Sequence, residues 1–236
     1  MISKTDKTGT INFSLGEVIF IDKPKNISSF GVIRKLKRIV KIKKIGHAGT
    51  LDPLATGLLI MCTGKFTKRI NEYQGMKKTY TGKFTLGAST PSFDSETEKI
   101  KEFDISEITE EQILKTRTQF LGKIEQQPPV YSALKINGER LYKKARRGEN
   151  PEIKKRIVEI FKFEIKDINL PEITFLVECS KGTYIRSIAN DFGKALNNGA
   201  YLSELRRTKI GDYDVADALT IDEFEKLIKE SNIESL

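Results

Sequence analysis

Tryptophan is absent from this chain, and its 236 residues include a single histidine and two cysteines. One histidine and two cysteines cannot supply a conventional Cys/His zinc site, so we expect no bound metal. Cys62 and Cys179 lie far apart in apolar stretches of the chain. We expect both to be buried free thiols in a reducing cytosol, and the protein to be cytoplasmic.

Long apolar runs are missing as well. A membrane-spanning helix needs about 18 consecutive apolar residues, and the sequence contains no such run. The first residues, MISKTDKTGT, also lack the apolar segment of a secretory signal. Phosphate-loop and dinucleotide-binding motifs are not found either, so we expect neither a membrane partner nor a cofactor.

Positive charge is abundant by contrast. Lys and Arg total 41 against 32 Asp and Glu, which gives a net charge of +9, and 38% of the residues are hydrophobic, enough for a packed core. Such a balance indicates a polyanionic partner, either nucleic acid or an acidic membrane, unless the source simply favours lysine. Predicted strands and helices mix without regular βαβ alternation, which favours an α+β fold.

The first predicted helix carries much of this charge. The strand predicted at Val18–Ile21 is followed by a helix that begins near Ser28 or Ser29 and has apolar residues at helical spacing. Seven basic residues and no acid lie between Arg34 and Lys44. That helix face could follow a phosphate backbone, although a plain solvated face fits equally well. A later alternating strand places Tyr80, Gly82, Phe84 and Leu86 on one side.

One acid, Asp52, stands alone in the stretch GHAGTLDPLATGLL, which contains the chain's histidine, His47. Asp before Pro is a common helix N-cap pattern, and this is the structural alternative. The glycines, however, allow close approach of a ligand, and a carboxylate is already ionised at neutral pH, so it can act as a nucleophile without a neighbouring base. A single lone acid does not match the paired carboxylates of a usual glycosidase.

Six segments, in order, resemble the TruB-type tRNA pseudouridine synthases over about residues 16–219. The segments are GEVIFIDKPKNISS, GHAGTLDPLATGLL, KTYTGKFTLGAST, QPPVYSALKINGERLYKKARRG, VECSKGTYIRSIANDFG and GAYLSELRRTKIGDYDVADAL. The resemblance implies the pseudouridine synthase fold, in which a mixed, mostly antiparallel central sheet is flanked by helices and carries a basic insertion. It also implies isomerisation of uridine to pseudouridine at position 55, in the T arm of tRNA, with base flipping and no cofactor.

The resemblance assigns roles residue by residue. It makes Asp52 the catalytic nucleophile and Tyr80 the tyrosine that stacks on the target base. It makes Tyr184 a second substrate contact, Arg186 the arginine that pairs with the aspartate, and Leu205 an apolar substrate contact. His47 is assigned to RNA binding, where its ring fills the gap left by the flipped base. Without the family, Tyr80 and Leu205 would be read as core residues, Arg186 as a surface arginine and His47 as a hydrogen-bonded structural residue.

The same resemblance divides the chain. We expect a catalytic domain at residues 11–219 with an insertion at about 126–152, and a short C-terminal helix at 220–236 in place of the RNA-binding PUA domain found in many members. The family's DKP motif corresponds to Asp22-Lys23-Pro24 here, and two residues later this chain has Asn26 where the family usually has Gly. Asn tolerates the left-handed conformation that such a turn needs. We expect a monomer that binds the T stem-loop. A tRNA-binding folding helper with secondary or no catalysis is the alternative, and a protein for acidic membranes is a weaker one.

Overall fold

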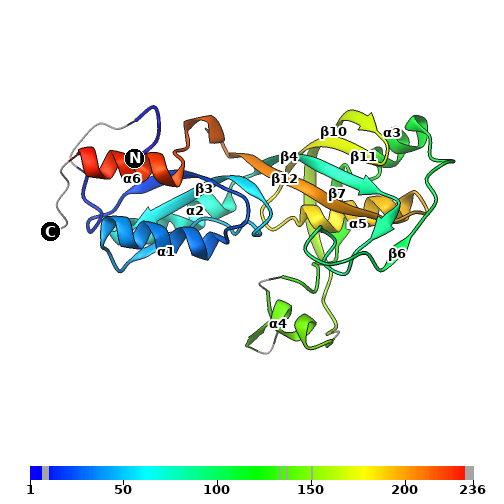
Figure 1. Ribbon diagram of the computed structural model, residues 1–236, viewed down its shortest axis with the longest axis horizontal. Helices are drawn as coiled ribbons and strands as arrows, with labels where there is room; N and C mark the ends of the chain where they lie inside the picture. The colour runs from blue at the N-terminus through cyan, green and yellow to red at the C-terminus, as the bar shows by residue number, and fades with distance from the viewer. Residues whose placement is uncertain (7–10, 133, 137, 150, 232–236) are drawn as a thin grey trace. The chain divides into compact units, whose positions relative to one another are not determined.

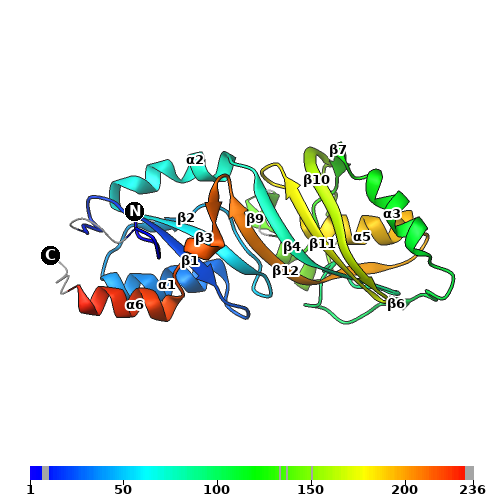
Figure 2. The ribbon, with the colours of Figure 1, turned by 90° about the horizontal axis from the view of Figure 1, so that it is seen from above.

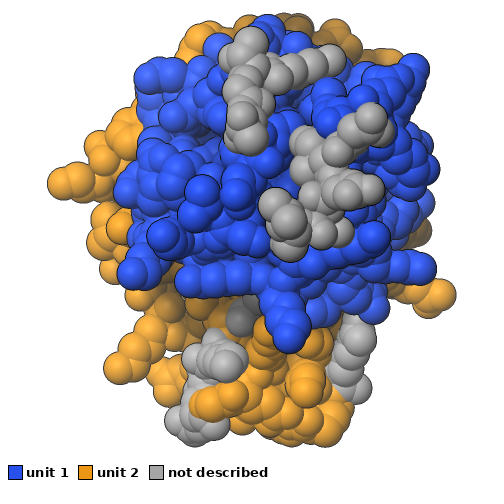
Figure 3. Space-filling view, turned by 90° about the vertical axis from the view of Figure 1, so that its left-hand side faces the viewer, with its two compact units in different colours: residues 1–80, 205–236 blue, residues 81–204 orange. Residues whose placement is uncertain are grey.

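The computed structural model describes residues 1–6, 11–132, 134–136, 138–149 and 151–231. The chain forms two compact units, residues 1–80 with 205–236 and residues 81–204, which are coloured separately in Figure 3. Helices and mostly antiparallel strands occur in both units, which confirms the α+β prediction.

The first unit contains β1 (Val18–Lys23), α1 (Ser29–Val40), β2 (Ile45–His47), β3 (Thr56–Thr63), the 3-10 helix η1 (Gly64–Arg69), α2 (Ile70–Gly75), β13 (Tyr213–Asp214), the 3-10 helix η2 (Val215–Asp217) and α6 (Ile221–Glu230). It also holds the start of β4 (Lys78–Leu86) and the end of β12 (Ala200–Ile210), two strands that run through both units. Figure 1 labels α1, α2, α6, β3, β4 and β12 among them.

Strand β3 is the centre of the first unit's sheet. It pairs antiparallel with β1 along its length and antiparallel with β2 at its end, so that His47 lies opposite Met61. At its beginning β3 pairs parallel with β12, where Arg206 lies opposite Thr56. The segment between β2 and β3 is therefore the loop of a hairpin whose base is held in the middle of the sheet.

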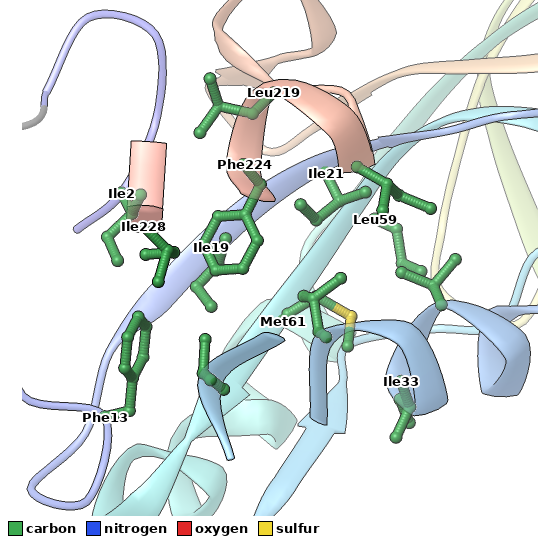
Figure 4. Packing of buried hydrophobic residues seen from close by; sticks show 14 residues of the cluster. Ile2, Phe13, Ile19, Ile21, Ile33, Leu59, Met61, Leu219, Phe224 and Ile228 are labelled. Atoms are coloured by element: carbon green, nitrogen blue, oxygen red, sulfur yellow. The ribbon is translucent and has the colours of Figure 1, made fainter. Parts of the chain in front are cut away.

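Both faces of β1 and β3 are buried, because their side chains alternate between two apolar clusters. Ile19, Ile21, Leu59 and Met61 face α1 and α6, and in Figure 4 Phe224 of α6 points at this group. Residues of the opposite parity, which are Val18, Phe20, Leu58, Ile60 and Cys62, pack with Tyr73, Ala48, Ile210 and Ala218. Near-continuous apolar strands of this kind are typical of a doubly covered sheet.

Helix α1 begins where the sequence predicts and ends earlier. Ser28 is the N-cap, and its hydroxyl accepts a hydrogen bond from Gly31 N at 3.0 Å. The helix ends at Val40, because Lys41 adopts the left-handed conformation with φ of 51°. Residues 41–44 therefore lie beyond the helix, and only the first part of the predicted basic helix face is helical.

The second unit holds β4 and β12 in part, with β5 (Ala88–Ser89), β6 (Lys101–Glu102), α3 (Glu110–Thr118), β7 (Gly122–Gln126), β8 (Lys135–Ile136), β9 (Glu139–Arg140), α4 (Leu141–Arg146), β10 (Arg156–Asn169), β11 (Glu172–Cys179) and α5 (Ile185–Ala195). Its main sheet has the order β12-β4-β11-β10-β7. Rings of Phe84, Phe163 and Phe175 on the strands pack with Phe192 of α5 and with Phe120, and Figure 2 shows α5 beside this sheet.

The insertion predicted at about 126–152 as an extended loop or hairpin contains the β8–β9 hairpin and the short helix α4. Its basic character is partly neutralised, because Arg147 binds the carboxylate of Glu139 through two hydrogen bonds of 2.7 and 2.9 Å and also contacts Glu149 at 2.7 Å. The Arg146 side chain lies outside what the structure describes. A phosphate at Arg147 would have to displace two carboxylates.

Candidate active site

Asp52 lies in the loop between β2 and β3, in the first unit. Pro53 and Leu54 form a turn in which Ala55 N donates to the carbonyl oxygen of Asp52 at 3.1 Å, and strand β3 begins directly afterwards at Thr56. No helix follows Asp52, so the alternative in which it caps one is wrong. Its side chain is partly exposed, as a group that meets a substrate must be.

Three separate elements hold this loop. From α1, the buried hydroxyl of Ser29 donates to the carbonyl oxygen of Leu51 at 3.0 Å and accepts from Leu51 N at 2.9 Å. From the end of β1, Asn26 N donates to the carbonyl oxygen of Pro53 at 2.8 Å. From β12, Arg207 donates to the carbonyl oxygen of Gly49 at 3.1 Å. The residues on both sides of Asp52 are therefore fixed before any ligand arrives, which is the arrangement a preorganised reactive group needs.

Asn26 adopts φ of 65°, so its left-handed conformation is confirmed. This conformation allows the chain to turn sharply after β1 and direct its backbone N–H at Pro53. Glycine would adopt the conformation without a steric cost, and Asn is among the residue types that tolerate it best.

Arg207 is the buried support of the loop and of the start of β3. Its side chain is 1% exposed, and its Nε donates to the carbonyl oxygen of Leu58 at 2.8 Å. Gly57, with φ of 104°, lies so close that a β-carbon there would collide with the Arg207 backbone. The close parallel pairing of β12 with β3 therefore requires glycine at this position.

Lys23 lies beneath the same loop and is fully buried. Its ammonium donates to three carbonyl oxygens, those of Pro24 at 2.9 Å, Ile27 at 2.7 Å and Pro53 at 3.3 Å. Burial lowers the pKa of Lys23 to about 8, with the Asp52 carboxylate acting in the opposite direction and Arg207 lowering it further. Lys23 thus places a positive charge close to the Asp52 carboxylate.

His47 ends β2, five residues before Asp52 on the same hairpin. Burial, and secondarily the charge of Arg207, lowers its pKa, so the imidazole is neutral at neutral pH. Its Nδ1 is buried and has no hydrogen-bond partner within the described part of the chain. A hydrogen bond with the Gly49 backbone acts on this pKa in the opposite direction, so the structure does not reject the reading of His47 as a hydrogen-bonded structural residue.

Leu205 lies on β12, the neighbour of β3 in the sheet, and Tyr80 lies on β4, the neighbour of β12. Tyr80 is 8% exposed and shares its face of β4 with Phe84 and Leu86, as predicted. Leu205 precedes the residue pair that joins β12 to β3, and its carbonyl oxygen accepts a bond from Thr56 Oγ1 at 3.4 Å. The Leu205 side chain is partly exposed, so the reading of this residue as ordinary core is not supported.

Tyr184 and Arg186 lie together in the second unit, at the start of α5. The Gln126 side chain, 1% exposed, accepts from Tyr184 N at 2.7 Å and donates to the carbonyl oxygen of Tyr184 at 3.0 Å. The Arg156 guanidinium stacks on the Tyr184 ring at 4.6 Å from its centre. This clamp fixes the position of a tyrosine whose side chain stays partly exposed.

Arg186 is 3% exposed, which rules out the surface arginine considered above. It donates to the carbonyl oxygens of Ser92 at 3.1 Å and Tyr131 at 2.9 Å, and its Nε lies 3.5 Å from Asp94 Oδ2. A buried guanidinium needs such partners. Its pairing with Asp52 joins the two units and stays a prediction.

Sequence reasoning missed the residues that support the site rather than form it. Ser29, Gln126 and Arg207 act through backbone groups of residues distant in sequence, and no local pattern marks them. Among the supporting residues, Lys23 was marked by a sequence motif, because it is the lysine of the DKP motif.

A metal-binding cluster and a membrane-spanning helix are two further features that a structure can reveal. Within the described ranges, no three His, Cys, Asp or Glu side chains gather as a metal ion would require. Across that same part of the chain, no helix has the length and apolar character to cross a bilayer.

Comparisons with known proteins match most of this chain. The profile of the TruB family pseudouridylate synthase N-terminal domain matches residues 37–185, and that of the tRNA pseudouridylate synthase B C-terminal domain matches residues 186–236. The tRNA pseudouridine synthase B of Flavobacterium johnsoniae is 57% identical over 91% of this chain and 96% of its own length. That of Phocaeicola vulgatus is 47% identical over 96% of this chain and 99% of its own.

Solved structures show the same fold. A Cbf5–Nop10–Gar1 complex contains a chain with TM-score 0.70 and 28% identity, matched over 94% of this chain. An H/ACA RNP bound to a substrate RNA containing 2′-deoxyuridine gives TM-score 0.69 and 26% identity, over 94% of this chain. This chain spans 58% and 57% of those two chains, respectively. On the strength of its profiles, its relatives and its fold, the chain belongs to the TruB family of pseudouridylate synthases.

Proposed function

We propose that this protein isomerises uridine to pseudouridine at position 55, in the T arm of tRNA, with Asp52 as the nucleophile. As a TruB family member whose relatives are named tRNA pseudouridine synthase B, it is an isomerase that acts on tRNA. The observation that carries the assignment of Asp52 is its loop, which is held on both sides of the carboxylate by bonds from Ser29, Asn26 and Arg207.

The chemistry needs no external donor. The Asp52 carboxylate attacks the target uridine at the ribose or at the base, and the bond between C1′ and N1 of the base breaks. The uracil turns, C5 bonds to C1′, and the bond between Asp52 and the nucleoside breaks, which regenerates the carboxylate. The proton on C5 leaves and N1 gains one, so the product is an isomer of the substrate. Because the enzyme must reach this nucleotide from several sides, the uridine is flipped out of the RNA.

The remaining residues hold the flipped base and the gap it leaves. Tyr80 stacks on the uracil, because an aromatic face accommodates a base that turns. Tyr184 and Leu205 complete its contacts. Arg186 pairs with Asp52 and keeps it ionised, and the neutral ring of His47 fills the place of the departed base.

We also propose the organisation in which this reaction takes place. Residues 11–219 form the catalytic domain with its insertion at about 126–152, and residues 220–236 are a short C-terminal segment that contains α6. The exposed basic residues of α1, Arg34, Lys35 and Arg38, follow phosphates of the RNA. The protein acts as a monomer in the cytoplasm.

The test is a pseudouridine map of unmodified tRNA after incubation with the wild type and with Asp52→Asn. We expect conversion at position 55 by the wild type, none by Asp52→Asn, and tRNA binding in both. Asp167→Asn, the same change at an exposed carboxylate of β10, is the control and keeps full activity. Full activity of Asp52→Asn would reject the nucleophile, and binding without conversion by the wild type would identify a folding helper.

A further inference from the structure

A cavity of about 330 Å³ opens in the first unit, at the end of α1. It is far larger than the roughly 10–15 Å³ that one water molecule needs. Its lining consists of Phe13, Ser14, Lys41, Ile42, Lys43, Lys44, Gly64 and Lys65. Four of these eight residues are lysines and none is acidic, so positive charge is concentrated around the cavity.

The four lysines are not balanced by carboxylates. Within residues 1–6, 11–132, 134–136, 138–149 and 151–231, none of them forms an ion pair or a side-chain hydrogen bond. Lysines elsewhere do: Lys83 lies 2.8 Å from Glu172, and Lys229 lies 2.8 Å from Glu225. Four exposed like charges around one hollow repel each other, and a bound anion would relieve that repulsion.

The walls of the cavity are held by backbone hydrogen bonds. Gly64 N donates to the carbonyl oxygen of Lys44 at 2.9 Å, and Lys65 N donates to that of Leu15 at 3.0 Å. Gly64 has φ of 49°, and a β-carbon there would collide with the Ser14 carbonyl. Three segments distant in sequence are therefore tied together, and the cavity exists without a ligand.

Lys41 occupies a backbone position that suits glycine better. Its φ of 51° is left-handed, a conformation that carries a steric cost for a residue with a β-carbon and none for glycine. Lysines near a helix C-terminus also interact favourably with the helix dipole, but that effect is small at the surface and ends within the last turn. It does not account for Lys65, which comes from η1.

We propose that this four-lysine cavity is a phosphate-binding subsite for the backbone of the RNA substrate, separate from the loop that carries Asp52. The inference rests on the proposed function for the identity of the RNA. Lysine supplies a flexible point charge that contacts phosphate without reading sequence, and each such contact releases counterions. The cavity shares no residue with the Asp52 loop, so it contributes to RNA affinity and not to the chemical step.

The experiment measures tRNA affinity against salt concentration in the Asp52→Asn background, where binding is separated from turnover. Lys43→Gln/Lys65→Gln removes two charges, and Lys41→Gly removes one while relieving the backbone. We expect the slope of log K against log[salt] to fall by about 0.7–0.9 for each phosphate that the variant no longer neutralises. Lys162→Gln/Lys166→Gln is the control, since it removes the same charge from a pair that flanks Glu164.

The outcomes separate the proposal from its alternatives. With Asp52 intact, we expect the cavity variants to raise KM about tenfold and leave kcat unchanged, with Lys41→Gly as stable as the wild type or more so. Slopes equal to that of the control would overturn the subsite. Saturation of the cavity by inorganic pyrophosphate, with tRNA affinity unaltered in the variants, would assign it to a free polyanion and also overturn it. If the variants show the expected slope change but the wild type modifies no tRNA, the proposed function fails and the subsite stands.

Discussion

The Ser29 hydroxyl both donates to and accepts from the backbone of Leu51, at 3.0 and 2.9 Å. Through this pair, the first residue of α1 fixes the residue that precedes Asp52. Both bonds are buried, so their loss leaves two backbone groups without partners.

Ser29→Ala tests this contact. We expect it to lower the free energy of unfolding by about 1–3 kcal/mol and to lower kcat, because the Asp52 loop loses its anchor. Ser28→Ala is the matched control, since it removes the N-cap of the same helix at a cost of about 1 kcal/mol and leaves the loop bonded. Thermal unfolding and single-turnover rates measure the two effects. Equal loss of kcat in both variants would show that helix stability alone is involved.

The buried ammonium of Lys23 predicts a pH dependence of stability. Its pKa is about 8 in the folded protein against an ordinary value near 10.5, so between these values the unfolded chain binds the extra proton. Stability therefore rises with pH across this window, by up to roughly 3 kcal/mol. Urea unfolding of the wild type and of Lys23→Met from pH 7 to 10.5 isolates the contribution, because the variant lacks the group. A constant difference between the two proteins would contradict the lowered pKa.

Asp52→Asn shifts the same window. Since the Asp52 carboxylate raises the pKa of Lys23, its removal lowers that pKa and moves the rise in stability to lower pH. The same urea series on Asp52→Asn measures this shift. An unchanged window would show that the two charges do not interact.

His47 can be observed directly, because it is the chain's one histidine and gives one imidazole signal in an NMR titration. Its pKa is lowered by burial, so we expect a midpoint below the ordinary 6.5. Between the two values the unfolded chain binds more protons, and stability is lost as pH falls from about 6.5. His47→Gln removes this acid-side loss. A midpoint above 6.5 would show that the imidazole is exposed or paired with an acid.

Gln126 holds Tyr184 through two hydrogen bonds, and this predicts a graded series. Gln126→Leu removes both bonds, and we expect kcat/KM to fall about tenfold, which corresponds to about 1.4 kcal/mol. Gln126→Glu keeps the acceptor for Tyr184 N and loses the donor. We therefore expect its kcat/KM to lie between those of the wild type and Gln126→Leu. Steady-state kinetics on tRNA, with thermal unfolding as the control for folding, measures the series. Equal losses in both variants would contradict the positioning role.

Local patterns predicted much of the fold. The cap at Ser28 and the apolar spacing of α1 are properties of a few neighbouring residues, and the alternating face of β4 is another. The end of α1 was harder to predict, because a lysine at a left-handed C-cap carries none of the usual signal of glycine. The alternative of a helix after Asp52 was wrong, because Gly57 packs against β12 and the segment pairs with that strand. This pairing could not be predicted locally, since β12 comes about 150 residues later in the chain.

The site, like the fold, could be predicted only in part from the sequence. Asp52, His47 and Tyr80 were found from motifs, and their roles stay predictions. The groups that hold them could not be found from the sequence, because Ser29, Arg207 and Gln126 bond to backbone atoms far along the chain. The burial of Arg186 with Asp94 depends likewise on two segments about 90 residues apart.

The two cysteines provide a consequence of another kind. Cys62 belongs to the first unit and Cys179 to the second, both are at most 1% exposed, and burial raises the pKa of Cys62 to about 11. The thiolate is the form that attacks an alkylating reagent, so each thiol reacts when its own surroundings open. The protein therefore carries one natural probe in each half, and mass spectrometry of its alkylation ranks the two openings without any added label.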